Sequence, residues 1–254
     1  MEVAQPGSAL VVGGSGGIGR ASCMFLAHQG WSVVVADRDG DSAAAVAGEI
    51  VRAGGRAQYV FADVTKRATL HAAVEASVVE FGGIDALINV AGITSPGPSA
   101  EVSDNDWNTL FDIHVGGSLR TSQAAFAALR ESPRPAIVHV ASVAARLGLP
   151  KRASYSSAKA AIEGLCRTLA VEWAPYGIRV NAVAPGYVRT PPVARMIDNG
   201  YVNEQSLTAR IPLRRLAEPT EIARVIACLV STDASYITGE TIFIDGGMMV
   251  SGEF

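Results

Sequence analysis

Tyr155 and Lys159 are the two side chains of this sequence best suited to proton transfer. They lie four residues apart, so on a helix they share one face. A cation beside a phenol favours the phenolate and lowers the phenol pKa from ~10 toward neutrality. The pair therefore predicts a tyrosine that acts as a general acid and base. The same spacing is also common in exposed helices, so its meaning depends on the neighbouring residues.

Ser142 is the residue that we expect beside this tyrosine. It directly follows the apolar run Ala136–Ala141, which is typical of a buried strand. Open α/β sheets bind ligands just past the carboxyl ends of their strands. The Ser142 hydroxyl is therefore predicted to hold a substrate oxygen.

A glycine-rich loop separates the first apolar run, Ala9–Val12, from an apolar helical segment. Two registers of the dinucleotide fingerprint fit this loop, and both end at Gly19. Glycines let the backbone approach a pyrophosphate closely, and a helix N-terminus offers it unpaired N–H groups. A tight structural turn is the alternative, but the flanking strand and helix favour nucleotide binding. The residues assigned to the cofactor here are Gly13, Ser15, Gly16, Gly17, Ile18 and Gly19.

Asp37 ends the second predicted strand, 18 residues after Gly19. An acid ~20 residues after the glycine loop is expected to bond the adenosine ribose of NAD, and its charge repels the extra phosphate of NADP. Arg38 follows directly and could instead face the adenine or contact that phosphate. NAD is therefore the expected cofactor, ahead of NADP. The alternative for Asp37 is a solvated turn residue.

The elements that must position these groups alternate between apolar runs and amphipathic segments, which is typical of parallel strands joined by helices. The predicted strands are Ala9–Val12, Ser32–Ala36, Gln58–Ala62, Asp85–Val90, Ala136–Ala141, Ile178–Val183 and Thr241–Ile244. Most are apolar throughout, so both faces of the sheet should be covered. We predict an α/β fold: one doubly wound Rossmann-type domain over residues 1–254, with a seven-stranded parallel sheet flanked by helices. The rival (β/α)₈ barrel needs eight strands and a phosphate site after the last two.

Several helices carry start or stop signals. Ser103 and Asp106 resemble a capping box that opens a helix running to about Arg130. Gly177 closes the helix that contains the Tyr-Lys pair. Pro219 is well placed as the first-turn proline of a later helix.

Composition excludes several classes of protein. The chain has 24 acidic and 21 basic residues, which argues against binding to nucleic acid or anionic membranes. It is 49% hydrophobic, yet no apolar run approaches ~20 residues and no basic leader opens it. We expect a cytoplasmic protein. No metal is expected, because acidic and cysteine neighbours at ligand spacing are lacking around His28, His71 and His139. The three cysteines, Cys23, Cys166 and Cys228, are predicted to be buried small hydrophobes.

Taken together, these residues resemble the short-chain dehydrogenase/reductase family over nearly the whole chain. Further matches, in order, are Asp63-Val64, Asn89-Val90-Ala91-Gly92, Asn181 to Gly186, Thr190 and the ending Ile244-Asp245-Gly246-Gly247. The resemblance implies hydride transfer between a nicotinamide and a carbinol carbon. It gives Tyr155 the proton exchange, Ser142 a bond to the substrate oxygen, and Lys159 a grip on the cofactor ribose.

The same resemblance assigns the rest of the cofactor site. It implies that Asp63 and Val64 touch the adenine, and that the stretch with Asn89, Ala91 and Gly92 passes the nicotinamide ribose. The residues that it places at the nicotinamide carboxamide are Pro185, Gly186, Val188 and Thr190.

Two positions depart from the family pattern. Val12 stands where the glycine motif usually begins with Thr. His114 stands where the family usually has an Asn that holds a water in the proton relay behind the lysine. An imidazole can bond a carbonyl or a water, and it can protonate near pH 6.5. We hypothesise that His114 takes part in the relay and adds an acidic limb to the pH profile. The alternative is a histidine packed within a bend of its helix.

Substrate specificity is expected from the segment 190–213, which the resemblance folds over the substrate. Further walls are predicted at Thr94, Ser142, Ala144, Leu149, Tyr155 and Tyr187.

The leading hypothesis is an NAD(H)-dependent oxidoreductase acting on a secondary alcohol or ketone. One alternative is an NADPH-dependent 3-oxoacyl-[acyl-carrier-protein] reductase, against which Asp37 argues. Another is a catalytically silent nucleotide-binding scaffold. By family analogy we expect a homotetramer.

Overall fold

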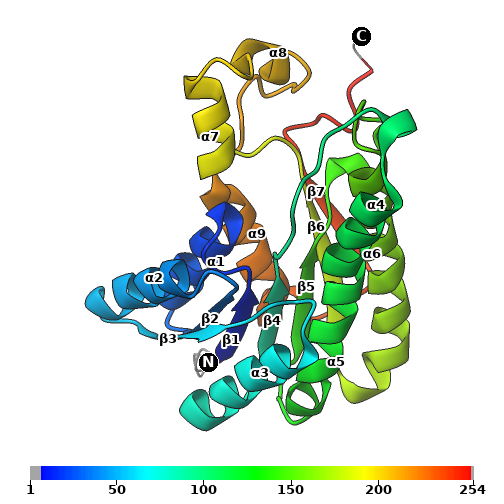
Figure 1. The fold of residues 1–254 in the computed structure, drawn as a ribbon. Coiled ribbons are helices and arrows are strands. Elements are labelled where there is room, and N and C mark those ends of the chain that lie inside the picture. Colours follow the sequence, from blue (N-terminus) through cyan, green and yellow to red (C-terminus); the bar gives the residue numbers. More distant parts are fainter. Residues whose placement is uncertain (1–6, 253–254) are drawn as a thin grey trace.

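Seven parallel strands form one sheet in the order β3-β2-β1-β4-β5-β6-β7 in the computed structural model, which describes residues 7–252 (Figure 1). The strands are β1 (Ser8–Val12), β2 (Ser32–Asp37), β3 (Arg56–Phe61), β4 (Ala86–Asn89), β5 (Ala136–Val140), β6 (Arg179–Pro185) and β7 (Thr241–Ile244). The chain runs outward from β1 to β3 on one side and from β4 to β7 on the other. This reversal between β1 and β4 is where doubly wound sheets bind ligands. The predicted fold is confirmed, and the eight-stranded barrel is excluded.

Helices cover both faces of the sheet, as the apolar strands require (Figure 1). They are α1 (Gly17–His28), α2 (Gly40–Arg52), α3 (Arg67–Phe81), α4 (Asp104–Phe111), α5 (Gly117–Arg130), α6 (Ala153–Trp173), α7 (Pro191–Asp198), α8 (Glu204–Thr208) and α9 (Pro219–Val230). Side chains of α1, α2 and α9 join the core on one face, and those of α3, α5 and α6 join the core on the other.

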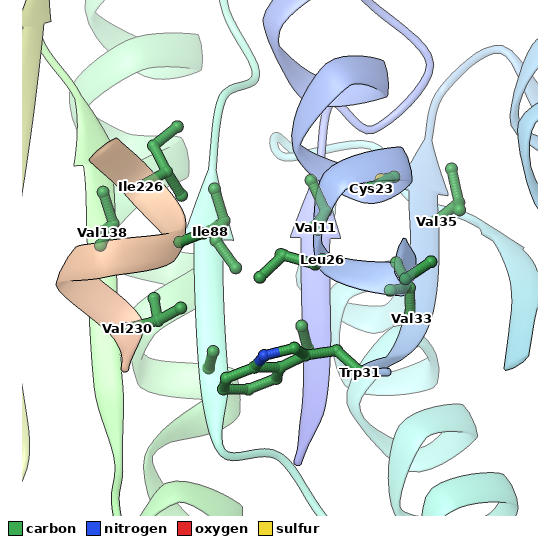
Figure 2. Close-up of a cluster of buried hydrophobic side chains, with 14 of the residues drawn as sticks. Val11, Cys23, Leu26, Trp31, Val33, Val35, Ile88, Val138, Ile226 and Val230 are labelled. Carbon is green, nitrogen blue, oxygen red and sulfur yellow. The ribbon is translucent and has the colours of Figure 1, made fainter. Parts of the chain in front are cut away.

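Figure 2 shows the first of these cores, where α1 and α9 pack over the central strands. Leu26 and Cys23 of α1 lie against Val11 of β1, while Ile226 and Val230 of α9 lie near β4 and β5. These side chains are almost fully buried. The packing fixes the start of α1 at the carboxyl end of β1, which positions the glycine loop.

The strand bounds differ from the predicted ones at several ends. β2 runs on through Asp37, and β3 starts at Arg56 rather than Gln58. β4 and β5 are each shorter than predicted, and β6 extends to Pro185. β3 also departs from the covered-strand pattern, because it is an edge strand on which Tyr59 and Phe61 stay about half exposed.

The helix predicted from Ser103 to Arg130 is divided. Its start is as predicted, because the Ser103 hydroxyl accepts a hydrogen bond from the Asp106 backbone N–H at 3.0 Å. A π-helical turn, Asp112–Gly116, then separates α4 from α5. Such turns concentrate at functional sites, and this one carries His114.

One cysteine contradicts the prediction. Cys23 and Cys166 are buried, but Cys228 is exposed on α9. The apolar pattern around Cys228 belongs to the opposite face of that helix, where Ile226, Ala227 and Val230 enter the core. Residues 1–6, for which no export leader is expected, lie outside the described residues.

The predicted substrate-covering segment, 190–213, contains α7 and α8 (Figure 1). Neither helix contributes a buried residue. These two helices therefore have no apolar core of their own.

Leu26→Ala should destabilise the protein by about 2–5 kcal/mol, because it leaves a cavity in a fully packed core. Denaturant unfolding would measure the loss. Val79→Ala is the matched control, since Val79 is 78% exposed and its truncation should change the free energy of unfolding by less than about 0.5 kcal/mol. Equal losses in the two variants would contradict the core assignment.

Candidate active site

A cavity of about 400 Å³ opens at the carboxyl ends of β1 and β4, where the strand order reverses. Its walls come from the glycine loop, the end of β2, the segment after β3, the segment after β4 and the start of α7. The lining residues are Gly13, Ser15, Gly16, Gly17, Ile18, Asp37, Arg38, Ala62, Asp63, Val64, Val90, Ala91, Gly92, Ile93, Ile113, Thr190 and Pro192.

The glycine loop has the shape that a pyrophosphate cradle needs. Gly13 has a left-handed φ of +81°, and a Cβ there would lie 2.7 Å from the Ala91 nitrogen. A Cβ on Gly19 would collide with the Gly13 carbonyl oxygen. The N-terminus of α1 has no side-chain cap and no acidic residue in its first turn. Its free N–H groups and positive dipole end are therefore available to an anion in the cavity.

Asp37 braces this loop from the end of β2. One carboxylate oxygen accepts hydrogen bonds from the Ser15 N–H at 3.0 Å and the Ser15 hydroxyl at 2.7 Å, and the other accepts from the Asp39 N–H. Asp63 lines the same cavity, and hydrogen bonds from Thr65, with a smaller effect of the Arg38 charge, lower the pKa of its carboxyl. The carboxylates of Asp37 and Asp63 and the guanidinium of Arg38 therefore lie at the same end of the cavity.

Most of the predicted cofactor residues line this cavity, and the structure thus brings them together. Seven do not: Gly19, Asn89, Tyr155, Lys159, Pro185, Gly186 and Val188. Asn89 is buried and donates through Nδ2 to the Ser118 hydroxyl at 3.2 Å, so its side chain links β4 to α5. Gly186 allows a close approach to β7, because a Cβ there would lie 3.0 Å from the Asp245 Cα. Contact of these seven with a cofactor stays a prediction.

Four further residues line the cavity without having been predicted as site residues: Ala62, Ile93, Ile113 and Pro192. Each lies within two residues of a predicted site residue. Adjacency was the only available signal, because small and apolar side chains carry no chemical signature of their own.

Ser142 and Tyr155 lie in contact with each other. The Ser142 hydroxyl hydrogen-bonds with the Tyr155 phenol, and it also accepts from the Ala144 N–H at 3.1 Å. Ser142 follows β5 and Tyr155 lies in the first turn of α6. Ala144 is itself buried, so it holds Ser142 rather than forming an open substrate wall.

The tyrosine pKa moves opposite to expectation. Burial raises the pKa of Tyr155 above its ordinary value, while the bond to Ser142 and the charge of Arg152 lower it. Lys159 lies 5.6 Å from the centre of the phenol ring, but the cation that acts on the pKa is Arg152. The sequence revealed the neighbouring charge but not the desolvation of the phenol.

Lys159 is almost completely buried, and its Nζ donates to the Val140 carbonyl at 2.6 Å. This bond joins α6 to the end of β5. Burial lowers the pKa of Lys159 to about 7. A lysine in this state can gain or lose a proton near neutral pH, which suits a group behind a proton-transferring tyrosine.

His114 connects the cavity wall to the tyrosine. Its Nε2 lies 2.8 Å from the Ile93 carbonyl oxygen, and its ring meets the Tyr155 ring edge-on at 5.7 Å. Its Nδ1 is buried without a protein partner among the described residues. Burial and the charge of Lys159 lower the pKa of His114 to about 3. The predicted acidic limb near pH 6.5 is therefore wrong, whereas a relay through the neutral imidazole stays a hypothesis.

The remaining predicted substrate walls are dispersed. Tyr187 lines a separate cavity of about 100 Å³ with Ile211 and Leu213. Thr94 is exposed and Leu149 is half-buried, and neither lines the dinucleotide-sized cavity.

Within residues 7–252, no three His, Cys, Asp or Glu side chains gather as a metal site would require. None of the helices there is long and apolar enough to cross a membrane.

Lys159→Met should stabilise the protein below pH 7, by on the order of 3 kcal/mol, because it removes a buried cation. The folded-state pKa lies below the unfolded one. The unfolded chain therefore binds more protons between about pH 7 and pH 10.5, and the stability of the native protein rises with pH across that window. The advantage of the variant should accordingly shrink toward pH 10. Denaturant unfolding at pH 6.5, 8 and 9.5 would measure it, with the exposed Lys66→Met as control. A gap independent of pH would contradict the buried charge.

Known proteins resemble the chain over almost all of its length. A family model described as enoyl-(acyl carrier protein) reductase matches residues 13–249. The short-chain reductase protein NovJ of Streptomyces niveus is 37% identical over 96% of this chain and 95% of its own. The crystal structure of gox2181 superposes with a TM-score of 0.92 at 31% identity, covering 97% of each chain.

Two further relatives carry the names of specific activities. Cyclohexanol dehydrogenase of Acinetobacter sp. is 36% identical over 94% of this chain and 93% of its own. The 3-oxoacyl-[acyl-carrier-protein] reductase FabG of Thermotoga maritima is 32% identical over 95% and 97%. With the sheet order and the glycine cradle, these matches establish that the chain belongs to the short-chain dehydrogenase/reductase family of oxidoreductases, which generally bind NAD or NADP.

Proposed function

We propose that this protein is an NAD(H)-dependent oxidoreductase acting on a ring-shaped secondary alcohol or its ketone. The observation that carries the proposal is the hydrogen-bonded pair of Ser142 and Tyr155, with the buried Lys159 one helical turn further along α6. Relatives named cyclohexanol, cyclopentanol and cis-4-hydroxycyclohexanecarboxylate dehydrogenase support the substrate class.

The residues of the chain divide the chemistry among them. Ser142 donates a hydrogen bond to the substrate oxygen and keeps it beside the phenol. Tyr155 gives its proton to that oxygen in ketone reduction and takes one from it in alcohol oxidation. Because burial favours the protonated phenol, Tyr155 is set to donate, and Arg152 eases its ionisation in the reverse direction. A bound nicotinamide dinucleotide would exchange hydride with the carbinol carbon.

The cavity supports a dinucleotide as cofactor. The uncapped start of α1 suits the pyrophosphate, and Asp37 and Asp63 suit the hydroxyls and amine of an adenosine. Lys159 and Tyr155 would face the nicotinamide end, beyond Gly92 and Ile93. Asp37 favours NAD over NADP, since an acid there repels a ribose phosphate.

The second candidate is an NADPH-dependent 3-oxoacyl-[acyl-carrier-protein] reductase, favoured by the relative of that name and by Arg38 beside the cavity. A silent nucleotide-binding scaffold is the candidate of another class. The proposed assembly is a homotetramer of a single-domain chain, supported by the family. Val171 near the end of α6 and Tyr176 in the turn that follows it are both exposed, which fits this assembly.

Tyr155→Phe should lower kcat by about 10²–10⁴ with cyclohexanol and NAD, because the proton carrier is lost. The dissociation constant for NADH, measured by fluorescence, should stay within about twofold. Tyr59→Phe is the matched control, since Tyr59 is exposed on an edge strand. The substrate panel should include cyclopentanol, an open-chain secondary alcohol and a 3-oxoacyl thioester. Full activity of Tyr155→Phe, or NADH binding with no turnover on the panel, would refute the proposal.

Asp37→Asn should shift the ratio of kcat/KM for NADPH over NADH upward by at least about tenfold, because the amide no longer repels the ribose phosphate. The amide keeps an acceptor for Ser15, so the glycine loop should hold its shape. Steady-state rates with each cofactor would measure the ratio. Asp41→Asn, a neutralisation on the exposed start of α2, should leave it unchanged. An unchanged ratio in Asp37→Asn would remove Asp37 as the selector.

A further inference from the structure

The residues that flank the substrate-covering segment on either side are hydrogen-bonded to each other. The Arg189 backbone N–H donates to the Ala217 carbonyl at 2.8 Å, and the Ala217 N–H donates to the Tyr187 carbonyl at 3.0 Å. Val188 and Ala217 form an isolated parallel bridge at the same place. The segment 190–213 therefore leaves and rejoins the body of the protein at one point, and Arg189 occupies that point.

The Arg189 side chain reaches two elements from there. Its guanidinium forms an ion pair with Glu204 in α8, and its Nε lies 3.7 Å from a carboxylate oxygen of Glu218, the residue that caps α9. The arginine and Glu204 side chains are each 35% exposed, so solvent screens their attraction only in part. One cation thus holds together two carboxylates that would otherwise repel.

Buried apolar side chains do not hold α7 and α8 in place. No residue of α7 or α8 is buried, and a cavity of about 590 Å³ lies between α7 and α1. Pro191 and Ala194 line it from α7, and Met24 and Phe25 line it from α1. Ile211 is buried near the C-terminal end of the segment, so the ion pairs of Arg189 act on α7 and α8, which contribute no buried residue.

The next residue brings the cofactor cavity into the same arrangement. Thr190 lines that cavity and packs on the glycine loop, because a Cβ on Gly17 would lie 2.8 Å from the Thr190 methyl carbon. A displacement of Arg189 would therefore move both the segment over the substrate and the wall of the cofactor cavity.

We propose that Arg189 is a positioning residue that holds the segment 190–213 in its observed arrangement through its ion pairs with Glu204 and Glu218. The inference rests on the proposed function only in that the segment covers a substrate. Arg189 touches neither substrate nor reacting atoms, and it acts through α8 and Thr190.

The experiment compares Arg189→Met, Arg189→Lys, Glu204→Gln and the double variant Arg189→Met/Glu204→Gln with the native protein. Arg167→Met is the matched control, because it removes the ion pair of an exposed arginine with Glu163 on α6, and neither of these residues lines the cavity between α1 and α7. Hydrogen exchange of the peptides spanning 199–209 is measured on every variant. KM and kcat are measured with cyclohexanol, an uncharged probe, at low and high salt.

Arg189→Met should raise hydrogen exchange in 199–209 by about fivefold and raise KM about as much, with kcat changed less than twofold. Arg189→Lys should change hydrogen exchange and KM less than Arg189→Met does, because lysine keeps the charge but lacks the planar donor geometry of the guanidinium. The double variant should be no worse than Arg189→Met alone, since both changes break one interaction. Salt should raise the KM of the native protein but not that of Arg189→Met.

Exchange and KM like those of the native protein in Arg189→Met would overturn the proposal. So would additive losses in the double variant, or an equal effect in Arg167→Met. If no alcohol is turned over, the proposed function fails, whereas the exchange rates of 199–209 still decide the role of Arg189.

Discussion

The geometry of the site depends on one buried bond, from the Lys159 ammonium to the Val140 carbonyl. That carbonyl belongs to the last residue of β5, just ahead of Ser142, and the ammonium belongs to the helix that carries Tyr155. This contact therefore ties α6, which carries Tyr155, to the end of β5, just before Ser142. Burying a cation is costly, so the fold has to compensate elsewhere, and the dense packing of both sheet faces supplies that stability.

Close backbone approach is the second constraint. The loop after β1 turns back on itself at Gly13 and Gly19, where side chains would collide with backbone atoms. The crevice between β1 and β4 can be narrow and polar because no side chain enters it at these positions. The phosphate-binding chemistry is supplied by the backbone, whereas the proton chemistry is supplied by side chains from β5 and α6. The two halves meet where His114 contacts both Ile93 and Tyr155.

The sequence predicted those features that rest on local patterns. Apolar runs and glycines identified the strands and the loop after β1, because burial on both faces and tight turns leave a compositional trace. The pKa of Tyr155 was predicted with the wrong sign, since spacing reveals a neighbouring charge but not the loss of water. The exposure of Cys228 depends on which face of α9 meets the sheet. Apolar cavity residues such as Ile93 have no local signature and needed the folded chain.

The π-helical turn Asp112–Gly116 makes the length of its segment a structural requirement. Each residue in an α-helix advances the side-chain direction by about 100°. A π-turn accommodates one residue more than an α-turn, so regular α-helical geometry with the same number of residues would rotate all of α5 relative to α4. Ser118 and Ser122 would then leave Asn89 and His139, the buried strand residues that they now contact. A further insertion here would therefore disrupt the interior polar contacts.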